Sequence, residues 1–358
     1  MLTINAGKLL KRKRWVAFLV IILFALVSVA LSGCGQKQSA EKESKETAQA
    51  VKTIRLSCAM PATYPQYKEV EEFARLVNER SKGALKVEIY PTATLYKDAD
   101  AVEAAASGAV EMISVPYFYV ARIVPQLRLF ELPYLITKDD AWFKIYDGEI
   151  GKKIAQQLEA KGLKLLGWGH TSTNVGGFET KKPVYAPGDM KGMKIRSAST
   201  TDAAIIAACG ATPVPLSASD LYMALQRGTI DGALGSPSHI ADRKLYEVTS
   251  YMVNLKSATA TWMILVNKEF FDSLLPELQK IVIDAGREAD LQSRPEWTRM
   301  VEEEWVPKAK EHGFTFIDPT PEQMAQWQKV FDQVYEEAYQ EVPELKELVA
   351  EVRKLEKE

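Results

Sequence analysis

The segment Asp189–Gly235 constrains the fold of this 358-residue chain more than any other. Short extended and short helical patterns alternate along it, which is typical of α/β folds with parallel strands. In chain order it predicts a strand, a helix, an extended stretch, a second helix and a third strand, over Met193–Arg196, Thr200–Ala208, Ala211–Leu216, Leu221–Arg227 and Thr229–Leu234. A threonine or aspartate within Thr200–Asp202 can cap the first helix. The first strand places one charge, Arg196, at its carboxyl end.

The residues before this segment repeat the alternation. Strand patterns are expected over Thr53–Cys58, Leu85–Tyr90 and Glu111–Val115, with helical patterns over Gln66–Arg80 and Lys97–Ser107 between them. This order is the βαβαβ unit of an open parallel sheet, whose ligand sites lie at the carboxyl ends of strands. Three further strands are expected over Leu163–Trp168, Val248–Asn254 and Thr261–Val266, the last returning to the first sheet.

The last third of the chain is mostly helical. A pattern running from Pro276 to Lys310 predicts one long helix, with a kink or break near Pro295 and Pro307, because proline cannot donate the helical hydrogen bond. A short strand over Phe314–Ile317 and a charged amphipathic helix over Pro321–Lys357 complete the chain.

The amino-terminal end has the features of a lipoprotein leader. A basic stretch, Lys11–Arg14, precedes the apolar run Trp15–Ala30, which is short for a membrane-spanning helix. The sequence Leu-Ser-Gly-Cys that ends at Cys34 resembles a lipobox, in which the cysteine carries the lipid. We therefore expect residues 1–33 to be a signal peptide and residues 34–51 a flexible tether. An uncleaved anchor helix, or plain secretion with a coincidental cysteine, is the alternative.

Composition and motifs exclude several classes of protein. A net charge of -2 gives no basic stripe for nucleic acid. The three histidines (His170, His239 and His312) are scattered, the chain has no Gly-x-Ser-x-Gly elbow, and no Cys or His spacing suggests zinc. We therefore expect no catalysis, cofactor or metal. Cys58 and Cys209 fall in different parts of the predicted fold and are expected to be free, buried thiols.

Several motifs together resemble the TRAP-type solute receptors, the DctP family. They are "DMKGMKIRS", "GATPVP" followed by "DLYMALQRGTIDG", "KLYEV", "SGAVEM", "LFELPYLIT" and "FFDSLLPELQKIVIDAG", and the resemblance runs from about Thr53 to about Gln340. It implies a two-lobed clamshell that is similar to periplasmic binding proteins, with a long helix spanning both lobes. We expect lobe I over 52–173 plus 256–300, and lobe II over 174–255 plus 301–358.

The resemblance also implies a function. Members of the family capture small organic acids outside the cytoplasmic membrane and deliver them to a membrane permease driven by an ion gradient. By this resemblance the chain is an extracytoplasmic, lipid-anchored receptor, on the periplasmic side or the outer face of a bacterial membrane, and not an enzyme. A receptor that feeds a signalling partner, or an extracellular lipoprotein enzyme, stays open as an alternative.

Site residues follow partly from the resemblance and partly from strand ends. In the family, the arginine of the "KIR" motif, here Arg196, forms a two-pronged salt bridge with the ligand carboxylate. A second arginine that many members carry is missing from Thr173–Phe178, and Gly235 stands where many have a polar residue. We therefore expect a less polar pocket with one cationic anchor, which favours a monocarboxylate with an apolar body. The candidate ligand-binding residues are Arg196, Tyr117, Phe118, Trp168, His170, Tyr64, Gly235 and Trp262.

Overall fold

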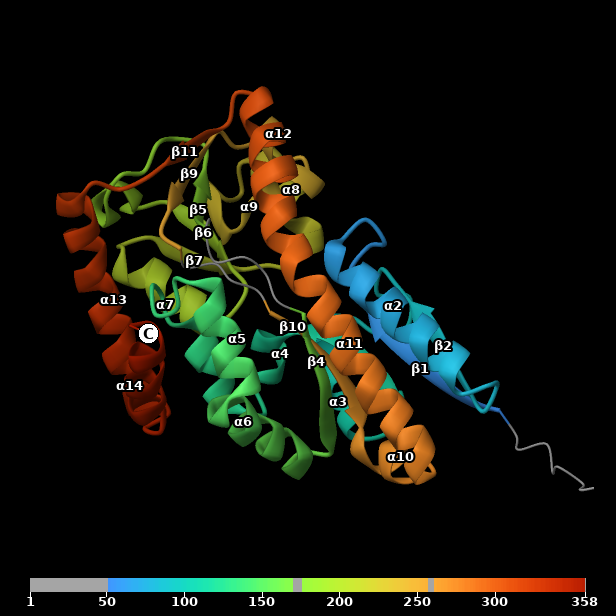
Figure 1. Cartoon of the computed structure of the whole chain (residues 1–358). Helices are drawn as coiled ribbons and strands as arrows, with labels where there is room; N and C mark the ends of the chain where they lie inside the picture. Colours follow the sequence, from blue (N-terminus) through green and yellow to red (C-terminus); the bar gives the residue numbers. More distant parts are fainter. Residues whose placement is uncertain (1–50, 170–175, 257–260, 358) are drawn as a thin grey trace, which may run out of the picture. The chain divides into compact units, whose positions relative to one another are not determined.

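Two β-sheets organise the described residues, 51–169, 176–256 and 261–357, of the computed structural model (Figure 1). The first sheet has the order β2-β1-β3-β10-β4. Its strands are β1 Lys52–Cys58, β2 Leu85–Tyr90, β3 Met112–Pro116, β4 Leu163–Gly169 and β10 Trp262–Asn267. Strand β1 pairs in parallel with β2 and β3, whereas β10 lies antiparallel between β3 and β4. The predicted βαβαβ unit and the return of the late strand to this sheet are both confirmed.

The second sheet has the order β11-β9-β5-β8-β6-β7. Its strands are β5 Gly177–Thr180, β6 Lys194–Ser197, β7 Thr212–Pro215, β8 Gly232–Gly235, β9 Tyr251–Asn254 and β11 Thr315–Ile317. Strand β6 pairs in parallel with both β7 and β8. The alternation read from Asp189–Gly235 is therefore confirmed, and its three strands lie side by side.

Helices connect and cover the two sheets. Those before residue 176 are α2 Pro65–Arg80, α3 Asp98–Ala106, α4 Tyr117–Val120, the 3-10 helix η1 Pro125–Glu131, α5 Asp139–Asp147 and α6 Glu149–Ala160. Those between the later strands are α7 Thr200–Ala208, α8 Leu221–Arg227, α9 Pro237–Asp242 and α10 Lys268–Asp272. Within the described ranges, no helix is both long and apolar enough to span a bilayer.

The predicted long helix is present as three consecutive pieces. Helix α11 covers Pro276–Met300, a π-helical turn (η5) covers Val301–Trp305, and α12 covers Val306–Glu311. The chain stays helical through Pro295, and the widened turn comes directly before Pro307, which has no N–H to offer the preceding carbonyl. Figure 1 shows this orange rod passing from α10, beside the first sheet, to α8 and α9, beside the second.

The rod packs on different partners along its length. Its first half contacts α2 and β4, where Gly286 brings the helix against Leu166 of β4. A β-carbon at Gly286 would lie 2.7 Å from the carbonyl oxygen of Leu166 and 2.9 Å from its β-carbon. Its second half packs Trp297 and Trp305 against Ala241 of α9. The expected long helix spanning both lobes is thereby confirmed.

The expected single helix over Pro321–Lys357 is wrong. It is two helices, α13 Pro321–Glu341 and α14 Leu345–Leu355. Val342 has φ -135° and ψ 83°, because a residue before proline is pushed out of the helical region, and Pro343 follows it. Helix α13 packs on α7, whereas α14 packs on α5 and η1. The lobe boundaries that we expect from the sequence stay a prediction.

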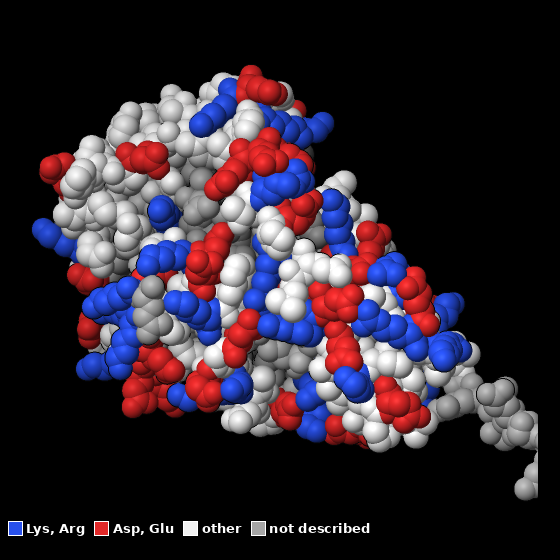
Figure 2. Space-filling view, viewed as in Figure 1, with Lys and Arg blue, Asp and Glu red and all other residues white. Residues whose placement is uncertain are grey.

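The described surface carries no basic stripe on the side viewed in Figure 2, where basic and acidic side chains are interspersed. Cys58 and Cys209 are free and buried, as expected. Burial raises the pKa of each thiol to about 12, so both stay protonated at neutral pH.

Candidate functional site

A cavity of about 670 Å³ is lined by segments that follow strands of both sheets. Of the eight ligand-binding residues expected from the sequence, six line it: Arg196, Tyr117, Phe118, Tyr64, Gly235 and Trp262. Trp168 is not among its lining residues, because its indole stacks on Tyr146 in the core at 4.7 Å between ring centroids. His170 lies outside the described residues.

Arg196 is the third residue of β6 and reaches this cavity while only 4% exposed. Its Nε donates to the carbonyl oxygen of Leu216 at 3.0 Å, which fixes the guanidinium. Its two terminal nitrogens have no hydrogen bond to any described residue. Burial lowers the pKa of Arg196, and Asp202 opposes that shift. Arginine nonetheless stays charged at physiological pH, so the cavity contains a buried, fixed cation with open donors.

The turn after β6 holds this arrangement in place. Ser199, rather than a threonine or aspartate within Thr200–Asp202, is the N-cap of α7, and its Oγ accepts from the backbone N–H of Asp202 at 3.0 Å. The Asp202 carboxylate in turn accepts from the N–H of Ala198 at 2.9 Å. This reciprocal capping binds the Asp202 side chain to backbone, beside Arg196.

A second arginine lines the cavity in addition to Arg196, the one cationic anchor that we expect from the sequence. Arg243 follows α9, and its Nη1 donates to the carbonyl oxygen of Ala218 at 2.9 Å. Its guanidinium carbon lies 5.8 Å from the ring centroid of Tyr64, a cation–π contact. Arg243 also lowers the pKa of Arg196, which shows that the two charges repel. This arginine stands at a helix end 47 residues after Arg196, far in the sequence from Thr173–Phe178, where the resemblance places the second arginine of many family members.

Gly235 has a steric reason to be glycine. A β-carbon there would lie 2.7 Å from His239 Nδ1 and 3.1 Å from Glu179 Oε1. Those two atoms lie 3.8 Å apart, and Glu179 is fully buried on β5. Burial lowers the pKa of His239 and the Glu179 carboxylate opposes the shift. The polar group that lines the cavity beside Gly235 is therefore His239 of α9, and the buried Glu179 of β5 lies behind it.

Aromatic side chains form another part of the lining. The short helix α4 follows β3 directly, and its Tyr117 and Phe118 meet edge to face at 5.9 Å. Tyr117 donates to the carbonyl oxygen of Phe130 at 3.0 Å, so its ring is fixed. Tyr64 and Trp262 meet edge to face at 6.4 Å. These rings offer apolar faces to a ligand.

Acidic and amide side chains make the cavity more polar than the sequence predicted. Asp98, at the start of α3, and Glu131, at the end of η1, both line it, and burial raises the pKa of each to about 7. Gln66 and Trp297 line it as well and are 1% and 3% exposed. These residues lie in helices, away from the strand ends to which the sequence argument was confined.

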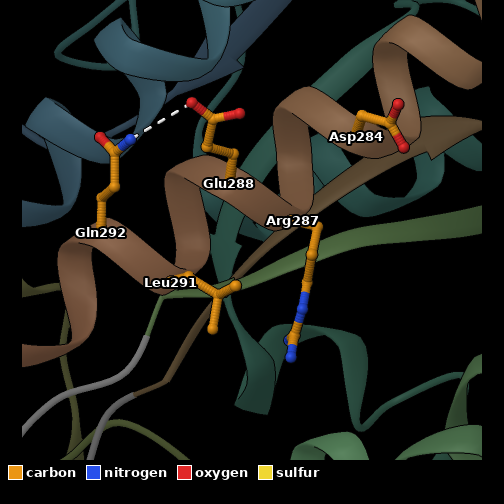
Figure 3. Close-up of a pocket in the computed structure, with 5 residues that line it drawn as sticks. All are labelled: Asp284, Arg287, Glu288, Leu291 and Gln292. Atoms are coloured by element: carbon orange, nitrogen blue, oxygen red, sulfur yellow. Dashed lines mark hydrogen bonds between the residues drawn. The ribbon is translucent and has the colours of Figure 1, made fainter.

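A second hollow, of about 410 Å³, lies on α11 and is lined by Asp284, Arg287, Glu288, Leu291 and Gln292 (Figure 3). All five belong to one helix, and Arg287 is already bound to Asp147 at 2.6 Å. Figure 3 shows Gln292 bonded to Glu288, at 3.4 Å, on the same helix. This hollow therefore offers no convergent set of ligand groups. Among the described residues, no group of three or more His, Cys, Asp or Glu side chains could hold a metal ion.

Comparison with known proteins agrees with this geometry. The family model of bacterial extracellular solute-binding proteins, family 7 (DctP), matches residues 56–342. The C4-dicarboxylate-binding periplasmic protein DctP of Rhodobacter capsulatus is 30% identical over 291 residues, which are 79% of this chain and 85% of that protein.

Two solved structures are similar over most of their length. A TRAP periplasmic solute-binding protein from Chromohalobacter salexigens with bound D-glucuronate has a TM-score of 0.79 at 26% identity, covering 84% of this chain and 99% of that one. One from Sulfurospirillum deleyianum with bound succinate has a TM-score of 0.77 at 27% identity, covering 85% and 98%.

Proposed function

The chain belongs to the bacterial extracellular solute-binding proteins of family 7, and from this premise we propose that it binds a small organic acid in the cavity around Arg196 and delivers it to a TRAP membrane permease. Binding needs no covalent chemistry, because a receptor has only to hold its ligand and release it. We further propose that the segments of the two sheets close on the ligand as lobes and that the closed form docks on the permease.

One observation carries this proposal: two arginines line the same cavity, and the two terminal nitrogens of the buried Arg196 have no hydrogen-bonding partner among the described residues. The burial of Arg196 and its repulsion by the half-buried Arg243 raise the free energy of the empty site. An anion between them removes that repulsion and supplies the missing acceptors. A carboxylate fits best, because its two oxygens match the two parallel N–H donors of a guanidinium.

We propose a monocarboxylate, with an apolar face on its body, as the ligand. The rings of Tyr64, Tyr117, Phe118 and Trp262 support an apolar face. Asp98 and Glu131 disfavour a second carboxylate, because like charges in a partly desolvated cavity repel strongly. In this respect the chain would differ from the R. capsulatus protein, which is named as C4-dicarboxylate-binding, and from the S. deleyianum protein, which has bound succinate.

A thermal-shift screen of carboxylates tests the proposed function. A ligand at about 100 times its Kd stabilises the native state by about 2.7 kcal/mol, so at least one monocarboxylate is expected to raise the melting temperature by several degrees. Succinate serves as the dicarboxylate control, and amides of the active acids control for the body alone. A screen in which amides and acids stabilise equally would contradict a carboxylate receptor.

We also propose that the protein is held to a membrane through lipid on Cys34. The support is the order of basic stretch, apolar run and Leu-Ser-Gly-Cys, which lies outside the described residues. Mass spectrometry of the native amino terminus is expected to find a diacylated cysteine as the first residue. An unmodified start at any other position would remove the proposal and leave the receptor function untouched.

A further inference from the structure

Several polar atoms at the cavity have no hydrogen-bonding partner among the described residues. They are both side-chain amide atoms of Gln66, Oδ1 of Asp98, Oε2 of Glu131, Nδ1 of His239, Nε of Arg243 and Nε1 of Trp297. Glu131 is only 7% exposed. A buried polar group without a partner destabilises the fold by roughly 1–3 kcal/mol. Several such groups in one cavity therefore indicate that a bound molecule supplies the missing hydrogen bonds.

The two acids, each with one oxygen that lacks a partner, and the two arginines come from different halves of the fold. Asp98 and Glu131 lie on α3 and η1, between strands of the first sheet. Arg196 lies on β6 and Arg243 follows α9, both within the second sheet's part of the chain. A ligand bound to the arginines would therefore lie between the two halves and also face the half that contributes the acids, of which Asp98 lies near enough to Arg243 for that arginine to lower its pKa.

Two other acids of the cavity already have partners. Asp202 accepts from the N–H of Ala198 at 2.9 Å, and Asp220 accepts from Ser217 Oγ at 2.6 Å. The spare acceptor capacity is thus concentrated on Asp98 and Glu131. Gln66 adds an acceptor and two donors.

We propose that this cavity selects a carboxylate whose body carries hydrogen-bond donors, hydroxyl or ammonium, that Asp98, Glu131 and Gln66 bind. The proposal rests on the proposed carboxylate function and adds the chemistry of the far end of the ligand. Burial raises the pKa of both acids to about 7, and a ligand donor, an ammonium above all, favours their ionised form by bonding to it. A methylene or a second carboxylate offers no donor and leaves the ionised form unpaired. The aromatic rings would cover the apolar face of such a body.

A series of acids built on one ring tests the inference by calorimetry. The probes are cyclohexanecarboxylate, with no donor; quinate, with hydroxyls; aminomethylcyclohexanecarboxylate, with an ammonium; and cyclohexanedicarboxylate, with a second carboxylate. We expect quinate or the ammonium acid to bind at least about tenfold more tightly than the other two, since bonds to charged groups discriminate strongly. Which of the two binds more tightly separates hydroxyl from ammonium donors.

Two variants tie that preference to named residues. Asp98→Ala and Glu131→Met each remove an acceptor and are expected to lower the affinity ratio of the preferred probe to cyclohexanecarboxylate by about tenfold. Affinity for cyclohexanecarboxylate itself should stay the same or rise, because one acidic group is gone from the cavity that holds the anion. Asp220→Asn is the matched control: it removes the same charge from an exposed lining residue that already has a partner, and should leave the ratio unchanged.

The outcomes separate the two proposals. Equal or tighter binding of cyclohexanecarboxylate or cyclohexanedicarboxylate by the wild type overturns the inference and leaves the carboxylate receptor standing. The inference is also overturned if neither variant, when folded, changes the affinity ratio of the preferred probe to cyclohexanecarboxylate. If the amides of these ring acids bind as tightly as the acids themselves, the receptor proposal is overturned as well. Asp98→Ala keeps the test decisive if Glu131→Met does not fold, because Asp98 is the less buried of the two.

Discussion

Replacing Arg196 with alanine is expected to weaken carboxylate binding by about 30- to 5000-fold. Arg196 is 4% exposed, and its guanidinium is bound to the protein through Nε alone, so its remaining donors are available to the ligand. Removing it leaves a partly desolvated anion without its main counter-charge. Because Arg243 lines the same cavity, we expect the loss to fall nearer the lower limit. Calorimetry with the acid found by screening measures it.

The conservative variant and a matched control give this prediction its specificity. Arg196→Lys keeps the charge but loses the fork, so it is expected to recover only part of the affinity. Arg227→Ala removes an exposed arginine at the end of α8, which does not line the cavity, and should change affinity by less than about twofold. Equal affinities for wild type, Arg196→Ala and Arg196→Lys, with folding intact, would remove the carboxylate clamp from the mechanism.

Replacing Gly286 with leucine is expected to destabilise the folded state by about 3 kcal/mol, at the upper end of the cost of overpacking. Its β-carbon would lie 2.7 Å from the carbonyl oxygen of Leu166, a backbone atom of β4 that cannot move without distorting the first sheet. The improved helix propensity, about 1 kcal/mol, does not offset this. Urea denaturation followed by circular dichroism should show a lower midpoint.

The control for this variant is a glycine with free space around it. Gly188, in the short turn before β6, has no other atom within 4 Å of the point where a β-carbon would lie, so Gly188→Leu is expected to change stability far less. If the two variants were equally stable, close contact between α11 and β4 at Gly286 would not be what holds the long helix on the first sheet.

Local sequence patterns predict the strands and helices of this chain well, because the spacing of apolar residues and the positions of helix- and strand-breaking residues are local properties. The βαβαβ order and the alternation around Arg196 depend on apolar spacing and on where proline and glycine stand. The split between α13 and α14 was missed although Pro343 gives a local reason for it, since the amphipathic pattern continues across it. Trp168 was misplaced because a strand end can bury its side chain in the core as readily as in a cavity.

The part of the site near strand ends was predicted from the sequence. Arg196 on β6, Gly235 on β8 and the aromatic residues that follow β3 all line the cavity. Arg243, Glu131 and Gln66 are on helices or at their ends, and nothing in their neighbouring residues shows that they converge. Their convergence depends on how helices pack on sheets, which no local pattern encodes. An arginine after a short helix, in a segment such as "HIADRKLYEV", is the kind of signal that a search for a second cation should include.

The position of β10 has a consequence for how this chain acquires its structure during synthesis. Strand β10 lies between β3 and β4, yet it follows β4 in the sequence by almost the whole of the second sheet. Until residues 262–267 emerge, β3 and β4 have no common neighbour, and each keeps an unpaired, apolar edge. Non-local pairing of this kind is slow to form, and such exposed edges promote aggregation. The first sheet therefore cannot be completed in chain order. A nascent chain that ends before β10 has to stay unfolded, or be held by a chaperone, if it is to fold correctly later.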